Sequence, residues 1–330
     1  MNRTPPTRAL GEFELIGRFF DRGPARRAAL GIGDDAALLP ASADHERVVT
    51  TDMLVAGRHF FDDVEPASLG HKALAVNLSD LAAMGASPEA FTLAVALPGV
   101  DETWLAAFAR GLFALADAHG CELVGGDTTR GPLCISITAI GRVPTGCALR
   151  RDGAQPGDDV WVSGALGAAA AAVLLGDRVA SGGAPTPGAL AERLDRPQPR
   201  LALGIELRHL ASAAIDVSDG LLADLGHVAE RSRLAMRIEA GAVPIDGALA
   251  DWPDAEALRL ALTGGDDYEL AFTAPVENRH AIGALGSRLS LPLSRIGTVL
   301  PGDGVGVVDS HGLPLAPDRR GFDHFAADEH

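Results

Sequence analysis

The sequence predicts a chain of two domains, each of which mixes β-strands with α-helices. Its 330 residues are enough for about two domains, and its 47% of hydrophobic residues is ample for packed cores. Apolar runs typical of strands and stretches with helical spacing occur in both halves. Between the halves, the stretch PTGCALRRDGAQPGD is rich in Pro, Gly and charge and indicates a boundary near residue 150. We therefore expect one domain over residues 1–149 and a second over residues 150–330.

The first half is expected to contain three helices and five strands. Apolar residues at helical spacing predict helices over residues 12–20 and 69–84, and a third that begins at Asp101. The sequence Pro-Ala-Ser before the second helix offers it a cap. Short apolar runs predict strands at residues 28–32, 47–51, 91–97, 122–124 and 133–143.

The second half again alternates strands, acidic turns and helices, without a repeat of fixed period. The predicted strands cover residues 160–163, 214–217 and 269–273, and the predicted helices cover 168–175, 201–211 and 221–232. The sequence GALG precedes the first of these helices. Its backbone N–H groups could hold a phosphate, and close packing of strand and helix would explain its glycines equally well.

Six apolar runs each end in a short turn that carries aspartate: RAALGIGDD, VVTTD, LAVNLSD, ELVGGD, AAIDVSD and LALTGGDD. One Gly-Asp turn is usually only a turn, but six of them after core-forming runs indicate functional groups on a rigid frame. Adjacent acids such as Asp34 and Asp35, or Asp266 and Asp267, repel one another unless a cation lies between them. Clusters of oxygen ligands suit Mg²⁺, usually as a bridge to phosphate. The pattern therefore predicts a magnesium-dependent enzyme that acts on phosphates.

Individual polar residues carry arguments of different strength. Asp80 lies within a predicted apolar helix and shares a face with Asn77, so a ligand role is favoured over a place on the solvated face. The turn GGDTTRG offers a carboxylate and two hydroxyls, but the chain has no GKS/T element of a Walker A loop. Arg150 and Arg151 are possible phosphate clamps, although boundary loops often carry solvated arginines. His59 follows Asp52 by seven residues, although a lone histidine is more often structural.

Composition excludes several other classes of protein. The formal net charge of −16 mainly favours solubility, and no basic stripe that would bind nucleic acid is visible. The three cysteines form no CxxC pair, which argues against a disulfide framework and a zinc site and fits a reducing cytoplasm. We expect no signal peptide, and the most apolar segment, residues 164–176, is too short to span a membrane. No Ser-His-Asp or Cys-His set stands out and Lys72 is the only lysine, so metal ions are expected to carry the chemistry.

An ordered set of motifs resembles the bacterial thiamine-monophosphate kinase family. The motifs are GIGDDAALL, TTDMLVAGRHF, HKALAVNLSDLAAMGA, GGDTTRG, DVSDGLLADLGH, TGGDDYEL and GFDHF. The resemblance runs from Gly11 almost to the end of the chain, and the combination of these motifs is highly specific. The family belongs to a wider group of ATP-binding proteins similar to aminoimidazole-ribonucleotide synthetase.

The resemblance implies a two-domain α+β fold and a homodimer. The N-terminal mixed sheets of two subunits would pair into a barrel, the C-terminal domain would be an α/β sandwich, and ATP would bind near the dimer interface. The implied reaction converts ATP and thiamine monophosphate into thiamine diphosphate and ADP, by in-line transfer assisted by several Mg²⁺ ions. The acceptor oxygen is already anionic near neutral pH, so the transfer needs no general base.

The resemblance also assigns roles to individual residues. The expected Mg²⁺ ligands are Asp35, Thr50, Thr51, Asp52, Asp80, Asp127 and Asp216, with Asp219 for a further ion. The expected nucleotide contacts are Gly126, Asp127, Arg151 and Ser218, and the expected contacts to thiamine monophosphate are His59, Asp266 and Phe322. Asp266 stands where the family often has Glu, and Phe322 where it has Tyr or Trp, which could alter substrate affinity. The alternatives are another ATP-using enzyme of the wider group, a metal-dependent phosphatase, or a non-catalytic sensor of magnesium and nucleotide.

Overall fold

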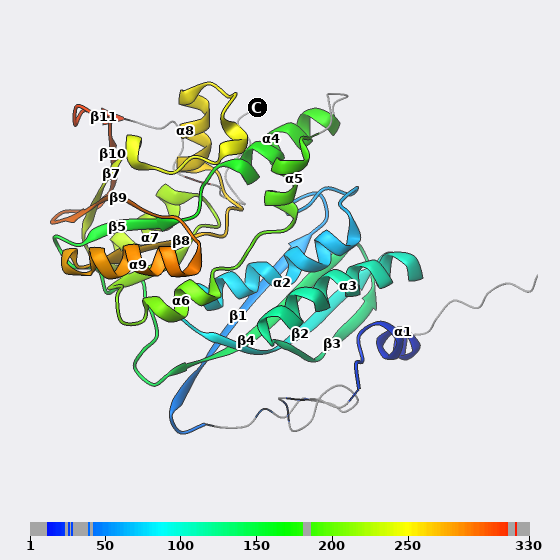
Figure 1. The fold of residues 1–330 in the computed structure, drawn as a ribbon. Coiled ribbons are helices and arrows are strands. Elements are labelled where there is room, and N and C mark those ends of the chain that lie inside the picture. The colour runs from blue at the N-terminus through cyan, green and yellow to red at the C-terminus, as the bar shows by residue number, and fades with distance from the viewer. Residues whose placement is uncertain are drawn as a thin grey trace, which may run out of the picture. The chain divides into compact units, whose positions relative to one another are not determined.

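The computed structural model describes residues 12–23, 26, 28, 39, 42–180, 186–315 and 321 (Figure 1). The chain divides into two compact units. The first unit comprises Met1–Ala43, Val49–Asn77 and Pro88–Ile140, and the second comprises Asp44–Val48, Leu78–Ser87 and Gly141–His330. Strands and helices occur in both, as the predicted α+β class requires. No helix among the described residues is long and apolar enough to cross a membrane.

The first sheet has four described strands in the order β1-β4-β2-β3. Their bounds are His45–Val55 for β1, Ser87–Leu97 for β2, Glu122–Arg130 for β3 and Cys134–Pro144 for β4. Burial alternates along β4, where Ile135, Ile137 and Ala139 are buried and the residues between them are partly exposed. One face of this sheet is therefore covered and the other is more open. Helix α1 spans Glu12–Phe19, α2 spans Pro66–Ala83 and α3 spans Glu102–His119.

Helices α2 and α3 approach each other backbone to backbone. A methyl group added at Gly70 would lie 2.1 Å from the carbonyl oxygen of Phe108, and one at Gly111 would lie 1.8 Å from that of Ala67. Only glycine fits at these two positions, so they fix where the helices cross. The helix predicted to start at Asp101 is confirmed as α3, with Asp101 as the N-cap residue whose carboxylate accepts the N–H groups of Thr103 and Trp104.

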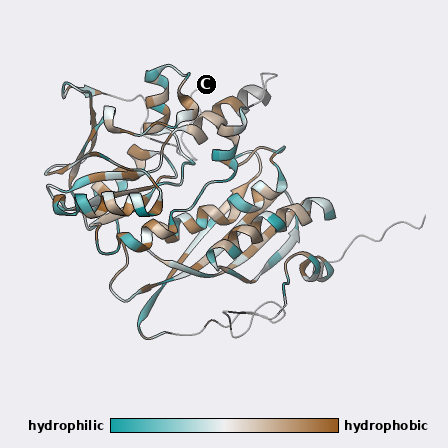
Figure 2. Cartoon of the chain, in the orientation of Figure 1, coloured by the Kyte–Doolittle hydropathy of each residue, from teal (hydrophilic) through white to brown (hydrophobic). Residues whose placement is uncertain are grey.

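The second unit contains a seven-stranded sheet in the order β11-β10-β7-β9-β5-β8-β6. The strands span Asp159–Ser163 (β5), Ala213–Asp216 (β6), Ala235–Glu239 (β7), Leu270–Ala274 (β8), Leu293–Leu300 (β9), Gly304–Val308 (β10) and Pro314–Leu315 (β11). Every residue of β5 and β8 is buried, so both faces of the sheet centre are covered. Hydrophobic residues run through the strands and helices of both units (Figure 2).

Six α-helices accompany this second sheet among the described residues. They span Ala168–Ala180 (α4), Gly188–Asp195 (α5), Leu201–Leu207 (α6), Leu221–Ser232 (α7), Asp254–Thr263 (α8) and Arg279–Leu289 (α9). Short 3-10 turns stand at Ala240–Ala242, Gly247–Leu249 and Val276–Asn278. The predicted helix over residues 221–232 is confirmed, whereas the helix predicted over 201–211 ends at Leu207.

Two of the expected acidic turns are not turns. Asp52 lies within β1 and Asp127 within β3, because both strands continue past the residues where turns were expected. Thr51 in β1 and Thr128 and Thr129 in β3 are β-branched residues that favour extended backbone. The Asp80 run is a helix, as its apolar spacing indicated, and not a run followed by a turn. The strand predicted over residues 28–32 lies mostly outside the described residues.

Candidate active site

The predicted residues Thr50, Thr51 and Asp52 are consecutive on β1, so their side chains alternate between the two faces of the sheet. The Thr51 hydroxyl oxygen lies 2.8 Å from that of Thr138, which faces the same side from β4. The side chains of Thr50 and Asp52 point to the other face. The backbone of Asp52 is fixed by Asn77 of α2, whose side-chain oxygen accepts its N–H at 3.1 Å. Asn77 therefore anchors the strand at Asp52.

Gly126 and Asp127 lie on β3, at the far side of the same sheet. Asp127 pairs in register with Ala94 of β2 and is exposed. Strands β4 and β2 separate β3 from β1, so Asp127 and Asp52 lie three strand spacings apart, roughly 14 Å. Magnesium binds its oxygen ligands at about 2.0–2.1 Å. One ion therefore cannot take both carboxylates of the same copy of the sheet.

His59 lies in the turn that follows β1. Its Nδ1 atom accepts the N–H of Val55 at 3.0 Å. A neutral imidazole that accepts at Nδ1 carries its proton on Nε2. The ring can therefore act as a donor through Nε2, which suits a phosphate or another anionic group.

Within the second unit, the residue next to Asp80 in the chain, Ser79, contacts Asp216. Asp216 ends β6, and its carboxylate accepts the hydroxyl of Ser79 at 2.7 Å. Both of these side chains are buried. Asp80 follows Ser79 directly in the last turns of α2 and is partly exposed. The predicted ligand Asp216 is thus hydrogen-bonded to the direct chain neighbour of the predicted ligand Asp80.

The loop that follows Asp216 is held in place by the carboxylate of Asp224, a residue that was not among the predicted site residues. One oxygen of the Asp224 carboxylate accepts the N–H groups of Ser218, Asp219 and Gly220, each at 3.1 Å. Burial, together with the charges of Asp216 and Asp219, raises the pKa of Asp224 to about 8. A signal was present in the sequence, because Asp224 interrupts the apolar stripe of Leu221, Leu225 and Val228 on α7.

The TGGDDYEL segment pairs with this loop through its backbone. The N–H of Asp266 donates to the carbonyl of Ser218, and the N–H of Tyr268 donates to that of Val217, both at 2.8 Å. Asp266 and Tyr268 have φ values of 65° and 50°, in the left-handed region. The Tyr268 hydroxyl donates to the Asp266 carboxylate at 3.0 Å. Tyr268 was also missed, although it is the only tyrosine of the chain.

Asp267 and Glu269 face the interior of the second unit. Both Asp267 carboxylate oxygens accept the N–H of Gly167, at 3.1 and 3.0 Å, and burial raises the pKa of Asp267 well above its usual range. Glu269 pairs with Arg200 and accepts the Ser163 hydroxyl at 2.5 Å. The last N–H of GALG is thus already bonded to a carboxylate of the same chain, which favours the packing interpretation of that sequence.

The remaining predicted residues are less closely tied to these loops. Ser218 and Asp219 lie in the loop that Asp224 holds, and both are partly exposed. Arg151 is an exposed residue in a turn, and its own backbone carbonyl accepts a hydrogen bond from the Ser232 hydroxyl at 2.9 Å. Asp35 and Phe322 lie outside the described residues. The predicted roles of all these residues stay predictions.

The donor chemistry of the second unit fits Mg²⁺. Among the described residues, no group of three or more His, Cys, Asp or Glu side chains is already gathered as an ion site. However, the negative charges of Asp216 and Asp219 add to burial in raising the pKa of Asp224. A divalent cation bound to these oxygens would relieve that repulsion.

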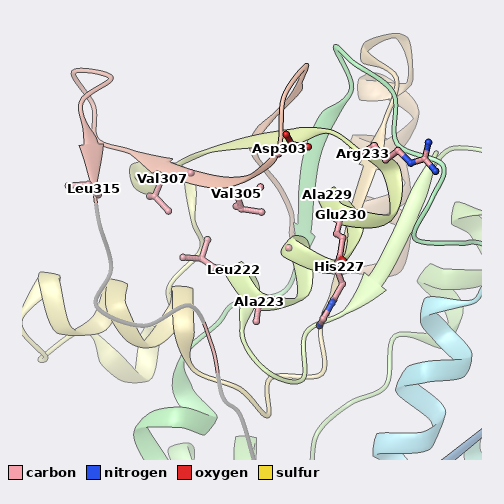
Figure 3. A pocket seen from close by; sticks show the side chains of 13 residues that line it. Leu222, Ala223, His227, Ala229, Glu230, Arg233, Asp303, Val305, Val307 and Leu315 are labelled. Carbon is pink, nitrogen blue, oxygen red and sulfur yellow. The ribbon is translucent and has the colours of Figure 1, made fainter. Parts of the chain in front are cut away.

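A separate cavity of about 750 Å³ lies between α7 and β10 in the second unit (Figure 3). Leu222, Val305 and Val307 point into it, and His227 and Arg233 stand at its edges. None of the predicted site residues lines this cavity. Its volume therefore does not mark the predicted site.

Two family models match the chain. The model described as AIR synthase related protein, N-terminal domain, matches residues 33–143, and the model for the C-terminal domain of the same proteins matches residues 155–310. Together with the two-unit fold and the acidic loops, these matches define a protein of the AIR synthase-related class.

The relatives narrow this class. Thiamine-monophosphate kinase of Salmonella typhimurium is 47% identical over 96% of this chain and 99% of its own length. The crystal structure of thiamine-monophosphate kinase from Stenotrophomonas maltophilia K279a is 51% identical with a TM-score of 0.81, over 89% of this chain and 94% of that one. The structure of AaThiL complexed with AMPPCP and TMP is 30% identical with a TM-score of 0.76, over 87% and 89%. The chain belongs to the thiamine-monophosphate kinase family, which confirms the resemblance.

Proposed function

We propose that this protein transfers the γ-phosphoryl group of ATP to the phosphate of thiamine monophosphate, forming thiamine diphosphate and ADP. Membership of the thiamine-monophosphate kinase family carries this proposal. The complex of AaThiL with AMPPCP and TMP supports ATP and thiamine monophosphate as the two substrates. The described carboxylates suit a reaction that must bring two polyanions together. Because the reaction consumes ATP, we place the enzyme in the cytoplasm.

We propose that the carboxylates Asp52, Asp80, Asp127, Asp216 and Asp219, with Asp35, would hold several Mg²⁺ ions. When bound, Mg²⁺ neutralises phosphate charge and orients the reacting oxygens. The acceptor phosphate is already anionic, so no residue of the chain has to remove a proton from it. The Thr51 hydroxyl already shares a hydrogen bond with Thr138, and we propose that Thr51 contributes through its backbone oxygen.

The substrate contacts have separate tasks in this proposal. His59 would donate through Nε2–H to the phosphate of thiamine monophosphate, since its Nδ1 is already an acceptor. The Asp266 carboxylate, which Tyr268 orients, would complement the positive thiazolium ring. Ser218, Gly126 and Arg151 would contact the nucleotide.

We further propose that the enzyme works as a homodimer. The open face of the first sheet exposes large hydrophobic side chains on β1, with Val49 62% and Met53 56% exposed. Asp52 and Asp127 stand at opposite outer strands of the described sheet, too far apart for one ion. A second copy that extends the sheet would bring Asp52 of one chain toward Asp127 of the other.

The test is incubation of the purified protein with ATP, MgCl₂ and thiamine monophosphate, with chelation by EDTA as control. We expect thiamine diphosphate and ADP in equal amounts, and neither product once EDTA removes the metal. ADP with free phosphate and no thiamine diphosphate would point to a different acceptor or to a phosphatase. Nucleotide binding without turnover would favour the sensor.

A further inference from the structure

Asp224 makes an unusual set of contacts for a residue near the start of a helix. One of its oxygens accepts three consecutive backbone N–H groups, those of Ser218, Asp219 and Gly220, at 3.1 Å each. Its side chain is buried, and its own N–H donates to the carbonyl of Gly220 at 3.0 Å. Three donors converging on one oxygen fix the orientation of three successive peptide groups.

In these contacts the positions of acceptor and donors are reversed relative to an ordinary helix cap. A capping side chain precedes the helix and accepts N–H groups of its first turn. In a capping box, the third helical residue reaches back to a single N–H group. Asp224 is the fourth residue of α7 and reaches back to three N–H groups that all precede the helix. Its effect therefore falls on the loop and not on the helix.

The loop that Asp224 holds carries residues of the proposed reaction. Asp216 ends the strand before this loop, and the backbone N–H groups of Ser218 and Asp219 donate hydrogen bonds to the Asp224 carboxylate. The carbonyl of Ser218 accepts the N–H of Asp266, which belongs to the proposed substrate contacts. A shift of Ser218 would therefore move both loops together.

We propose that Asp224 is a positioning residue of this enzyme, which touches neither substrate and sets the geometry of Ser218 and Asp219 beside Asp216. The inference rests on the proposed function for the identity of the substrates. It goes beyond that function because it assigns a task to a residue outside the predicted contacts. A displacement of about 1 Å at a reacting group can reduce a rate by about a hundredfold, so a buried anchor of this kind can govern the rate.

The test compares D224N, which keeps a carbonyl oxygen as acceptor, with D224L, which has similar size and no acceptor. We expect D224L to lower kcat/KM by about a hundredfold and to raise the Mg²⁺ concentration for half-maximal rate. We expect D224N to recover most of this loss and to stay within about tenfold of wild type. Equal kcat/KM values for D224L and wild type, at equal folded fractions, would overturn the proposal.

Two further variants separate positioning from stability and from metal binding. D159N is the matched control, because Asp159 is also a buried carboxylate but does not contact these loops. It accepts hydrogen bonds of 2.5 and 2.7 Å from the Arg279 side chain. We expect it to lower stability without changing the Mg²⁺ dependence. A D159N defect as large as that of D224L would overturn the proposal. D216N removes a proposed ligand, and a D224N variant as inactive as D216N would also overturn it, even where D224L fails to fold.

Binding of AMPPCP with Mg²⁺, measured by calorimetry, keeps this inference separate from the proposed reaction. Wild-type protein that binds the analogue and makes no thiamine diphosphate would contradict the acceptor and leave Asp224 open to the same test. In that case we expect weaker binding by D224L than by D224N and D159N. Equal binding by all three would overturn the role of Asp224.

Discussion

At the scale of single residues, Asp266 and Tyr268 form a strained pair. Both non-glycine residues hold positive φ values, 65° and 50°, within a stretch of three residues. Such conformations cost of order 1–3 kcal/mol each and persist only where the surroundings enforce them. The backbone bonds from both residues to residues 217–218 supply that enforcement. This backbone conformation places the Asp266 carboxylate within hydrogen-bond distance of the Tyr268 hydroxyl.

We expect Tyr268→Phe to affect binding of thiamine monophosphate selectively. The variant keeps the ring and removes only the hydroxyl bonded to Asp266. A hydrogen bond to a charged group contributes about 1.5 kcal/mol or more, so the KM for thiamine monophosphate should rise roughly tenfold. Steady-state kinetics with each substrate varied in turn checks this, and an unchanged KM for ATP is the internal control. An unchanged KM for thiamine monophosphate would refute the role of the hydroxyl.

His119, in the last turn of α3, should make stability depend on pH. Burial lowers the pKa of His119 below its usual value of 6.5. The unfolded chain then binds the proton more readily than the folded one, so the free energy of unfolding falls as the pH drops below about 6.5. Urea titrations at about pH 7.5 and about pH 5.5 should show a smaller acid-induced loss in His119→Gln than in wild type. Equal losses would show that His119 does not contribute.

The contrast between predicted and missed residues has a physical cause. Asp216 and Asp219 end a strand and stand in a turn, where short polar residues after an apolar run are visible in the sequence. Asp224 and Tyr268 act through backbone groups of a neighbouring loop, and no local pattern reveals which N–H groups a side chain will meet. Thr51 is a residue that was predicted together with Thr50 and Asp52. Because all three lie on a strand, the Thr51 side chain points to the opposite face of the sheet from the other two.

At the scale of elements, the crossing of α2 and α3 depends on glycine. We expect Gly111→Ala to destabilise the fold by at least about 1–3 kcal/mol, because the added methyl group would meet the rigid carbonyl of Ala67. Gly283→Ala on α9 is the matched control, since its methyl group would meet nothing within 4 Å. Its higher helix propensity should stabilise by roughly 0.5–1 kcal/mol. Chemical denaturation of both variants checks the opposite signs, and equal effects would contradict the close approach.

Elements with strong local signals were predictable, and elements defined by tertiary pairing were not. Helix α7 matches its predicted range and α3 starts at the predicted position, directly after Asp101, because helical spacing is a local signal. Strand β3 runs on through GGDTTR because parallel pairing with β2 supplies hydrogen bonds that outweigh the turn preference of the glycines. Strand β7 was missed because five residues between a helix and a 3-10 turn leave too short an alternation to recognise.

At the scale of the whole molecule, the first sheet has two features that a single copy of the chain does not explain. Its open face exposes Val49 and Met53. Its proposed ligands Asp52 and Asp127 occupy opposite outer strands among those described. Hydrophobic exposure of this kind marks interaction surfaces, and a symmetric dimer would bury the same face of both copies. The proposed homodimer accounts for both features, and it predicts that each active site takes residues from two chains.

Mixed dimers test this prediction directly. D52N and D127N homodimers should both be inactive, because every site then lacks one proposed ligand. A dimer with one D52N chain and one D127N chain contains one site with both substitutions and one site with neither, so it should recover about half of the wild-type activity. The two chains can carry different affinity tags, with sequential purification isolating the mixed species. A mixed dimer as inactive as its parents would mean that Asp52 and Asp127 serve the same site from one chain, which the strand order argues against.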